Sequence, residues 1–245
     1  QAHLASVLTL PAGTVHIVSD VHGEDKKLAH IVRNASGSLR PLVSRILADR
    51  VTPDEQRALL ALLYYPQESF RAARLTDAMS RRAFLRKNLP PLLDVLRALA
   101  GGYSKRHFTQ TVEEGACEIL WELMLIGELG RPAEFFDALV DPFVAAAKEL
   151  DLIRFVAHGI RNLSVHELIV AGDLGDRGPR LDKVVDILLH QPNVSITWGN
   201  HDASWMGACL GEPACIATVL RLSMRYRRLS QLEEGYGIIV APVEK

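Results

Sequence analysis

The sequence predicts an α/β protein in which a long all-helical segment interrupts a sheet that is packed by helices. Three short apolar runs rich in β-branched residues lie near the two ends of the chain, and each run ends in a polar loop. Two of these runs are followed by segments in which apolar residues recur with helical spacing. Because strand, helix and strand alternate, we expect at least two parallel strands with helices packed on them.

The expected elements follow from local signals along the chain. Strands are expected at residues 14–20, 165–171, 194–198 and 237–243. Helices with one apolar side are expected at residues 24–34 and 181–190. In the long segment between the first two strands, Pro53 and the acidic residues after it predict a helix start, whereas Gly101 and Gly102 predict a helix end. We therefore expect residues 1–40 and 151–245 to form the sheet-containing core and residues 41–150 to form a helical insertion.

The composition excludes several classes of protein. The chain has 245 residues, of which 28 are Lys or Arg and 29 are Asp or Glu, so its net charge of −1 argues against a dedicated nucleic-acid binder. A hydrophobic content of 48% argues against disorder. No apolar run approaches the roughly 20 residues that a membrane-spanning helix needs, so no membrane partner is expected.

The cysteines and the start of the chain bear on its compartment. Three cysteines without a C-x-x-C pair favour neither a disulfide framework nor a structural zinc site, so we expect a reducing, cytoplasmic location. The mildly apolar residues 4–12 follow no basic stretch, and we do not expect a signal peptide.

Three polar segments lie at the ends of predicted strands. Residues 19–23 read S-D-V-H-G, residues 172–178 read G-D-L-G-D-R-G, and residues 199–202 read G-N-H-D. Each segment alone is more often a turn or a helix cap than a functional site. Because ligands gather outside the carboxyl ends of parallel strands, the three segments together favour one shared site, although 153 residues (173 − 20) separate the first two.

The residue types in these segments predict a site for two divalent metal ions. Asp20 and His22 are expected to hold one ion, Asn200 the other, and Asp173 to bridge both. Carboxylate, imidazole and amide ligands suit manganese, iron, zinc or magnesium. In such a pair the ions activate a shared water molecule as the nucleophile, so that no serine or cysteine nucleophile is needed.

The neighbouring polar residues predict the remaining chemistry. Arg177 offers a planar set of donors for a phosphate group. His201 is expected to protonate the departing alkoxide as general acid. We expect Asp202 to hold the imidazole of His201 and Asp176 to fix a metal ligand from behind. The basic cluster at residues 221–228 is expected to be a solvated helix face, because the chain as a whole is not basic.

These motifs resemble the calcineurin-like metallophosphoesterase superfamily. A longer resemblance is narrower and points to the class 3 fructose-1,6-bisphosphatases of bacteria; it is carried by residues 10–24, 33–40, 63–66, 103–106, 199–207, 215–221 and 232–237. The resemblance implies a calcineurin-like sheet with an unusual helical insertion. It also implies manganese-dependent hydrolysis of fructose 1,6-bisphosphate to fructose 6-phosphate and phosphate in gluconeogenesis, with a small sugar bisphosphate as the partner and a possible homo-oligomer.

One departure from the superfamily pattern affects the expected activity. The pattern continues with further histidine ligands, including a late G-H-x-H segment, whereas no histidine follows His201 here. We therefore expect a fold incomplete at the C-terminus, resembling an N-terminal portion of the enzyme, and little or no turnover from this chain alone.

Two other interpretations of the function stay open. One is another metallophosphoesterase, either a protein serine/threonine phosphatase or a dinucleotide polyphosphate hydrolase. The other is a truncated, non-catalytic module.

Overall fold

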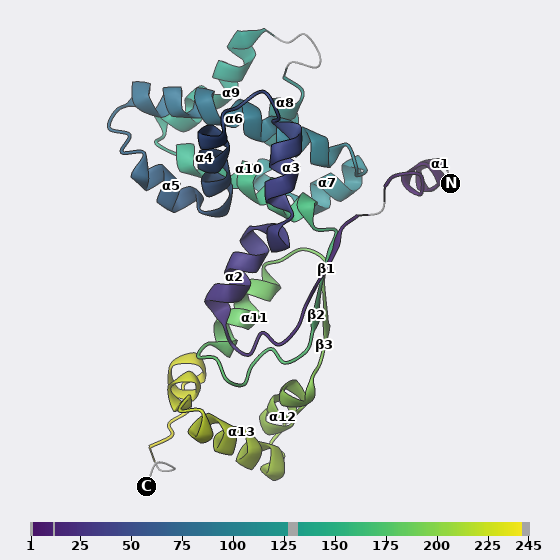
Figure 1. The fold of residues 1–245 in the computed structure, drawn as a ribbon, viewed down its shortest axis with the longest axis vertical. Coiled ribbons are helices and arrows are strands. Elements are labelled where there is room, and N and C mark those ends of the chain that lie inside the picture. Colours follow the sequence, from purple (N-terminus) through teal and green to yellow (C-terminus); the bar gives the residue numbers. More distant parts are fainter. Residues whose placement is uncertain (1, 12, 127–131, 242–245) are drawn as a thin grey trace. The chain divides into compact units, whose positions relative to one another are not determined.

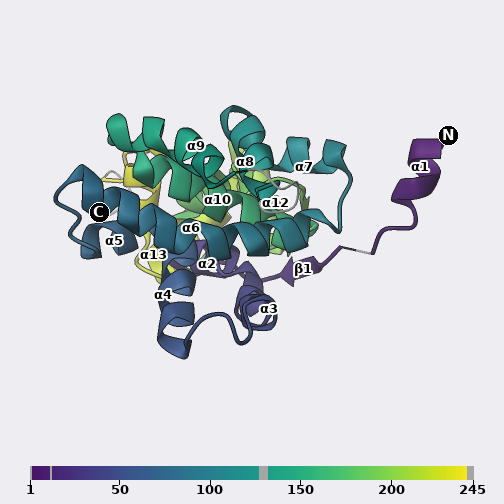
Figure 2. The same cartoon turned by 90° about the horizontal axis from the view of Figure 1, so that it is seen from above.

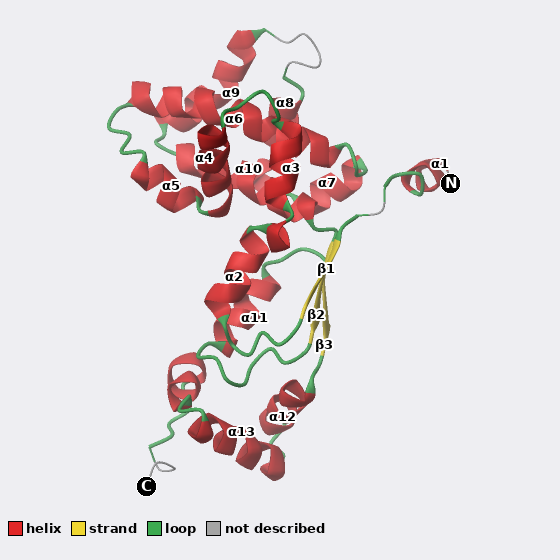
Figure 3. Ribbon diagram, viewed as in Figure 1, coloured by secondary structure: helices red, strands yellow, loops and turns green. Residues whose placement is uncertain are grey.

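The chain divides into two compact units, which are described separately. The computed structural model describes residues 2–11, 13–126 and 132–241. Residues 15–32 and 166–245 belong to one unit, here called the sheet unit, and residues 1–14 and 33–165 belong to the other, here called the helical unit. Figure 1 follows the chain through both units, and Figure 3 shows that the described strands all lie in the sheet unit.

The sheet unit contains a three-stranded parallel sheet in the order β1-β2-β3. The strands are β1 (Val15–Val18), β2 (Glu167–Ala171) and β3 (Val194–Thr197). Val18 pairs with Val170, and Val170 pairs with Ile196. This confirms the parallel arrangement that the alternation of strand and helix predicts.

Two helices lie on one side of this sheet (Figure 1). They are α2 (Asp25–Arg33) and α11 (Leu181–Leu189). Each buries its apolar side, with Leu28 of α2 and Val184 of α11 at 1% and 0% exposure. Along β1 the half-buried residues His16 and Val18 alternate with the exposed residues Val15 and Ile17, and Ile17 is 70% exposed. The alternation is clearest in β2, where Leu168 and Val170 are buried.

The C-terminal part of the sheet unit differs from the prediction. The helices α12 (Asn200–Cys209) and α13 (Pro213–Arg225) follow β3, and a π-helical turn spans Gln231–Gly235. The strand predicted at residues 237–243 is wrong for residues 237–241, which form no strand, and residues 242 and 243 lie outside the described residues. The reason is that Val240 packs with Val219 and Leu232 in a small apolar cluster instead of pairing with a strand.

The helical unit is built from helices alone within its described residues. They are α1 (Ala2–Val7), η1 (Ala35–Gly37), α3 (Leu39–Ile46), α4 (Pro53–Tyr64), α5 (Pro66–Ala72), α6 (Ala78–Ala100), α7 (Lys105–Thr111), η2 (Glu114–Ala116), α8 (Cys117–Met124), α9 (Ala133–Ala145) and α10 (Glu149–Ser164). Figure 2 shows α6 and α10 between α8 and α9 on one side and α3 and α4 on the other. Leucines of α6 such as Leu89, Leu92 and Leu96 are fully buried in the core between these layers.

Local signals explain where these helices begin and end. The side chains of Thr52 and Glu55 cap the first turn of α4 reciprocally, and Pro53 is its first residue, as the sequence predicts. The helix α6 ends at Gly101, again as predicted. The helical unit extends further than residues 41–150, because α10 continues to Ser164 and packs against α6.

Two further findings concern the chain as a whole. All three cysteines are free thiols. Among the described residues, none of the helices has the length and apolar character that crossing a membrane requires.

Candidate metal and phosphate site

Backbone hydrogen bonds join the loop after β1 to the loop after β2. The backbone N–H of His22 donates to the carbonyl of Asp173 at 2.8 Å, and that of Gly23 donates to the carbonyl of Leu174 at 2.7 Å. The N–H of Gly178 donates in return to the carbonyl of His22. The first and second polar segments, which are far apart in the chain, therefore lie side by side at the carboxyl ends of β1 and β2.

The buried carboxylate of Asp202 joins the third polar segment to the second. Its Oδ2 atom accepts hydrogen bonds from the backbone nitrogens of Asp173 at 2.6 Å and Gly199 at 2.8 Å. Its Oδ1 atom accepts from the backbone nitrogen of Leu174 at 2.8 Å. Hydrogen bonds to an ionised carboxylate are among the stronger ones in proteins, so this side chain fixes the two loops against each other.

This arrangement differs from the sequence-based expectation for Asp202, which was to hold the imidazole of His201. Both oxygens of Asp202 are engaged by backbone N–H groups, because the start of α12 directs this side chain back into the loop after β2. The carboxylate beside the ring of His201 is instead that of Asp176, whose Oδ2 atom lies 3.4 Å from Nε2.

Three of the four expected metal ligands lie on backbone of unusual conformation. Asp20, His22 and Asp173 have φ values of 54°, 49° and 55°, in the left-handed region that residues with a Cβ atom rarely adopt. Such conformations cost of order 1–3 kcal/mol each and gather at functional sites. The hydrogen bond between the backbones of His22 and Asp173 holds two of these residues in this state.

Glycines allow the close approach of the loops. A Cβ atom on Gly199 would lie 2.7 Å from the carboxyl carbon of Asp173, closer than atoms can pack. A Cβ atom on Gly178 would lie 2.6 Å from the carbonyl carbon of Gly23. Gly172, with a φ of 81°, turns the chain directly before Asp173.

The side chains of Asp20 and His22 lie together, with Oδ1 of Asp20 3.5 Å from Nε2 of His22. The other ring nitrogen of His22, Nδ1, is buried and has no hydrogen-bond partner. Asp173 accepts a hydrogen bond at 3.3 Å from the backbone nitrogen of His201, and Asn200 is the exposed first residue of α12. Within the part of the chain that the structure describes, no three His, Cys, Asp or Glu side chains form a group that could hold a metal ion.

The donor set nevertheless fits a divalent metal. It comprises two carboxylates, one imidazole and one amide, which are ligand types of manganese, iron, zinc and magnesium. The Nε2 atom of His22 faces the Oδ1 atom of Asp20 at 3.5 Å, so one cation can take a ligand atom from each side chain. The loops of Asp20, His22 and Asp173 are joined to each other, and the loop of Asn200 is joined to them by Asp202.

A second group of side chains adjoins this set. The Oδ2 atom of Asp176 accepts a hydrogen bond from Nε of Arg177 at 3.1 Å and also faces His201. The rings of His201 and His22 lie almost perpendicular to each other with their centres 6.1 Å apart. The carboxylate of Asp176 is buried and its Oδ1 atom has no hydrogen-bond partner, so it remains free to accept one.

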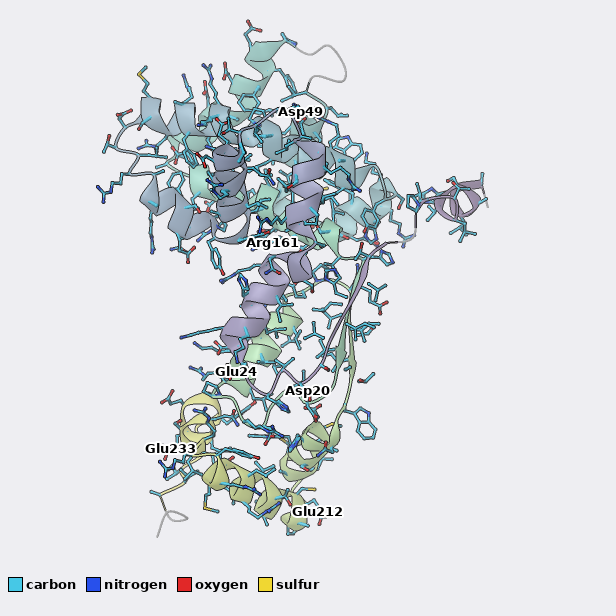
Figure 4. All side chains as sticks on the ribbon, viewed as in Figure 1. Asp20, Glu24, Asp49, Arg161, Glu212 and Glu233 are labelled. Atoms are coloured by element: carbon cyan, nitrogen blue, oxygen red, sulfur yellow. The ribbon has the colours of Figure 1, made fainter. Side chains whose placement is uncertain are left out.

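Arg177 lines a pocket of about 300 Å³. Asp20, His22 and Gly178 also line this pocket, which lies between the loop after β1 and the start of α2. Figure 4 shows Asp20 at the end of β1 and Glu24 ahead of α2. The side chain of Arg177 is more than half exposed and can reach a ligand from solvent.

Two residues of the site were not predicted. The guanidinium carbon of Arg177 lies 5.8 Å from the ring centre of Tyr226, and its backbone carbonyl accepts a hydrogen bond at 2.8 Å from Nε of Arg228. Both residues belong to the basic cluster at residues 221–228, which the sequence suggests is a solvated helix face. The clustering of arginines at residues 221–228 is a signal for phosphate contact, but nothing in the sequence shows that α13 ends beside the loop after β2.

Comparison with known proteins bears on this site. The model of the Firmicute fructose-1,6-bisphosphatase family matches residues 2–245. Proteins named fructose-1,6-bisphosphatase class 3 are similar to the chain: that of Fusobacterium nucleatum is 32% identical over 241 residues, and that of Staphylococcus epidermidis is 33% identical over 244 residues. Both alignments cover 98% of this chain and 37% of the relative, so the chain spans just over a third of the length of these curated relatives. No solved structure matches the chain.

Proposed function

Since the chain belongs to the Firmicute fructose-1,6-bisphosphatase family, we propose that the full-length gene product hydrolyses the 1-phosphate of fructose 1,6-bisphosphate in a metal-dependent reaction. The observation that supports this most is the hydrogen-bonded junction of the loops after β1, β2 and β3. Asp202 and the backbone of Asp173 join the three loops on which the expected oxygen and nitrogen donors lie.

We assign Asp20, His22, Asp173 and Asn200 as the residues that hold the metal, for which we propose manganese. A bound divalent cation supplies Lewis-acid charge, which favours attack on the phosphorus atom. The calcineurin-like fold and a cytoplasmic location are part of the same proposal.

The other residues act on the substrate directly or position those that do. Arg177 binds a phosphate oxygen through its planar donors, and its contacts with Asp176 and Tyr226 hold the guanidinium in place. His201 delivers a proton to the sugar oxygen that leaves, because an alkoxide is a poor leaving group without one. Asp176 orients the ring of His201. Asp202 is a positioning residue that acts through the two loops it joins.

The proton transfer by His201 is tested by comparing leaving groups. The variant His201→Asn is expected to lower kcat for fructose 1,6-bisphosphate by about 10²–10⁴-fold, the usual contribution of a general acid. The same variant should lower kcat for p-nitrophenyl phosphate far less, because nitrophenolate leaves without a proton. Equal losses with both substrates would contradict this role.

The substrate is tested with a panel of phosphate compounds. We expect manganese-dependent phosphate release from fructose 1,6-bisphosphate to exceed release from a phosphoserine peptide and hydrolysis of diadenosine tetraphosphate. A preference for the peptide or the dinucleotide would replace the proposed substrate with that of another metallophosphoesterase. No release from any of them by the full-length protein would favour a non-catalytic module.

A further inference from the structure

Arginines gather where α13 ends, beside the loop after β2. Arg225 is the last residue of α13, and Arg228 follows it three residues later. No carboxylate of the described residues forms an ion pair with either side chain. Both guanidinium groups therefore carry a positive charge that the described part of the chain does not neutralise.

The ring of Tyr226 brings Arg225 close to Arg177, the arginine that we assign to the reacting phosphate. The guanidinium carbons of Arg177 and Arg225 lie 5.8 and 5.9 Å from the ring centre of Tyr226. The separation of the two guanidinium carbons therefore cannot exceed the sum of these distances. Because an aromatic ring attracts cations to its face, Tyr226 offsets part of the repulsion between the two charges.

Arg228 reaches the same loop from the turn that follows α13. Its Nε atom donates a hydrogen bond at 2.8 Å to the backbone carbonyl of Arg177. The terminal amino groups of its guanidinium donate to no other described residue, so they remain available to a ligand beside Arg177.

The backbone that carries Arg228 is held in place by the end of α13. The N–H of Arg227 donates to the carbonyl of Met224 at 3.1 Å, and the N–H of Arg228 donates to the carbonyl of Ser223 at 2.7 Å. With a φ of 55° at Arg227, these two bonds form the Schellman motif that commonly ends a helix. The side chain of Arg228 therefore extends from a backbone of fixed direction.

We propose that Arg225 and Arg228 bind the second phosphate of a sugar bisphosphate, the one that is not hydrolysed. This rests on the function proposed above, in which Arg177 binds the reacting phosphate. The two phosphates of fructose 1,6-bisphosphate lie at opposite ends of a six-carbon sugar, so the substrate requires further cations near Arg177 but separate from it. A guanidinium offers paired N–H donors to phosphate oxygens, which gives a bisphosphate an advantage over a monophosphate.

Lys27 is a further cation near Arg177, because both residues line the pocket of about 300 Å³. Its Nζ atom lies 3.4 Å from a carboxylate oxygen of Glu24, which lines the same pocket. This ion pair already offsets the charge of Lys27, whereas Arg225 and Arg228 have no such partner among the described residues. The structure therefore favours the two arginines for the second phosphate.

Fructose 1-phosphate tests the assignment kinetically, because it lacks only the second phosphate. The value of kcat/KM is measured with manganese for the full-length protein and both sugars, and we expect the wild type to prefer the bisphosphate. Arg225→Gln should lower kcat/KM at least tenfold for the bisphosphate and less than twofold for fructose 1-phosphate. Arg228→Gln should narrow the same preference, although loss of its hydrogen bond to Arg177 lowers both values.

Fructose 6-phosphate tests the same site without turnover, because it carries only the second phosphate. Its dissociation constant is measured by calorimetry on the full-length protein with a chelator present. We expect Arg225→Gln to raise this constant at least fivefold. Arg45→Gln, which removes the same charge from an exposed position of α3, should match the wild type, as should Lys27→Gln.

The two experiments distinguish failure of this site from failure of the proposed function. Equal losses for both substrates in Arg225→Gln would overturn the proposal, since they indicate that Arg225 only stabilises the end of α13. An unchanged affinity for fructose 6-phosphate in Arg225→Gln, or a loss confined to Lys27→Gln, would overturn it too. Binding that depends on Arg225 in a full-length protein without activity would support this phosphate site and refute the proposed hydrolysis.

Discussion

The Oδ2 atom of Asp202 lies 2.6 Å from the backbone nitrogen of Asp173, so a buried side chain of the third loop fixes the backbone of the second. Asp202→Asn replaces one of its two acceptor oxygens by a donor, which then faces a backbone N–H group. We expect the free energy of unfolding to fall by about 1–3 kcal/mol, the cost of leaving a buried donor unsatisfied. Urea denaturation measures this loss. The control Asp186→Asn alters an exposed carboxylate of α11, and equal stability of the two variants would contradict this role of Asp202.

A methyl group at Gly199 tests whether the close approach of the loops is needed. Gly199→Ala places a Cβ atom 2.7 Å from the carboxyl carbon of Asp173, so the carboxylate or the loop must move. We expect manganese affinity, measured by calorimetric titration, to fall at least tenfold. Gly115→Ala is the matched control, because a Cβ atom there meets nothing within 4 Å. Unchanged affinity in Gly199→Ala would show that Asp173 does not need its observed position.

The contact between Asp176 and His201 predicts a loss that depends on the leaving group. Asp176→Asn keeps the shape of the side chain but removes the charge that lies 3.4 Å from Nε2 of His201. Because Asp176 positions His201, Asp176→Asn should lower kcat for fructose 1,6-bisphosphate more than kcat for p-nitrophenyl phosphate, as His201→Asn does. Steady-state kinetics with both substrates check this, and a rise in KM with unchanged kcat for both would contradict it.

The stability of the helical unit should depend on His158 in mild acid. Desolvation and the charges of Arg161 and Arg154 lower the pKa of His158 from 6.5 to about 4. Because the folded pKa is the lower one, the unfolded chain binds more protons between these values. Stability therefore falls as the pH drops from about 6.5 toward 4. Because part of the side chain is exposed, solvent screens the effect.

Melting temperatures across this pH range measure the dependence on His158. We expect His158→Asn to flatten the decline, whereas His190→Asn, an exposed histidine at the end of α11, should leave it unchanged. An identical decline in the wild-type protein and in His158→Asn would contradict the lowered pKa.

The sequence predicts the fold well where local signals are strong. β-Branched runs mark β1, β2 and β3, and Thr52, Pro53 and Gly101 mark helix ends, because capping and turn preferences act over a few residues. The segment at residues 237–243 misled the prediction, since Ile238, Ile239 and Val240 read as a strand although Val240 packs on a cluster with Val219.

The sequence predicts which residues belong to the site better than it predicts the contact that each of them makes. Three strand-end motifs suffice to expect that Asp20, His22 and Asp173 lie on neighbouring loops. Which carboxylate faces His201 depends on the direction of the first turn of α12, where Asp202 points back to the backbone of Asp173 and Asp176 reaches the ring. A sequence pattern does not specify the direction of a side chain within a single helical turn.

The measurement that tests the account most directly is manganese-dependent phosphate release from fructose 1,6-bisphosphate by the full-length protein carrying Asp173→Asn, with Asp186→Asn as its control. If Asp173 is a metal ligand on loops joined at the end of the sheet, Asp173→Asn should lower kcat/KM at least 100-fold and weaken manganese binding, while Asp186→Asn matches the wild type. A rate and a manganese affinity in Asp173→Asn equal to those of the control would contradict the account.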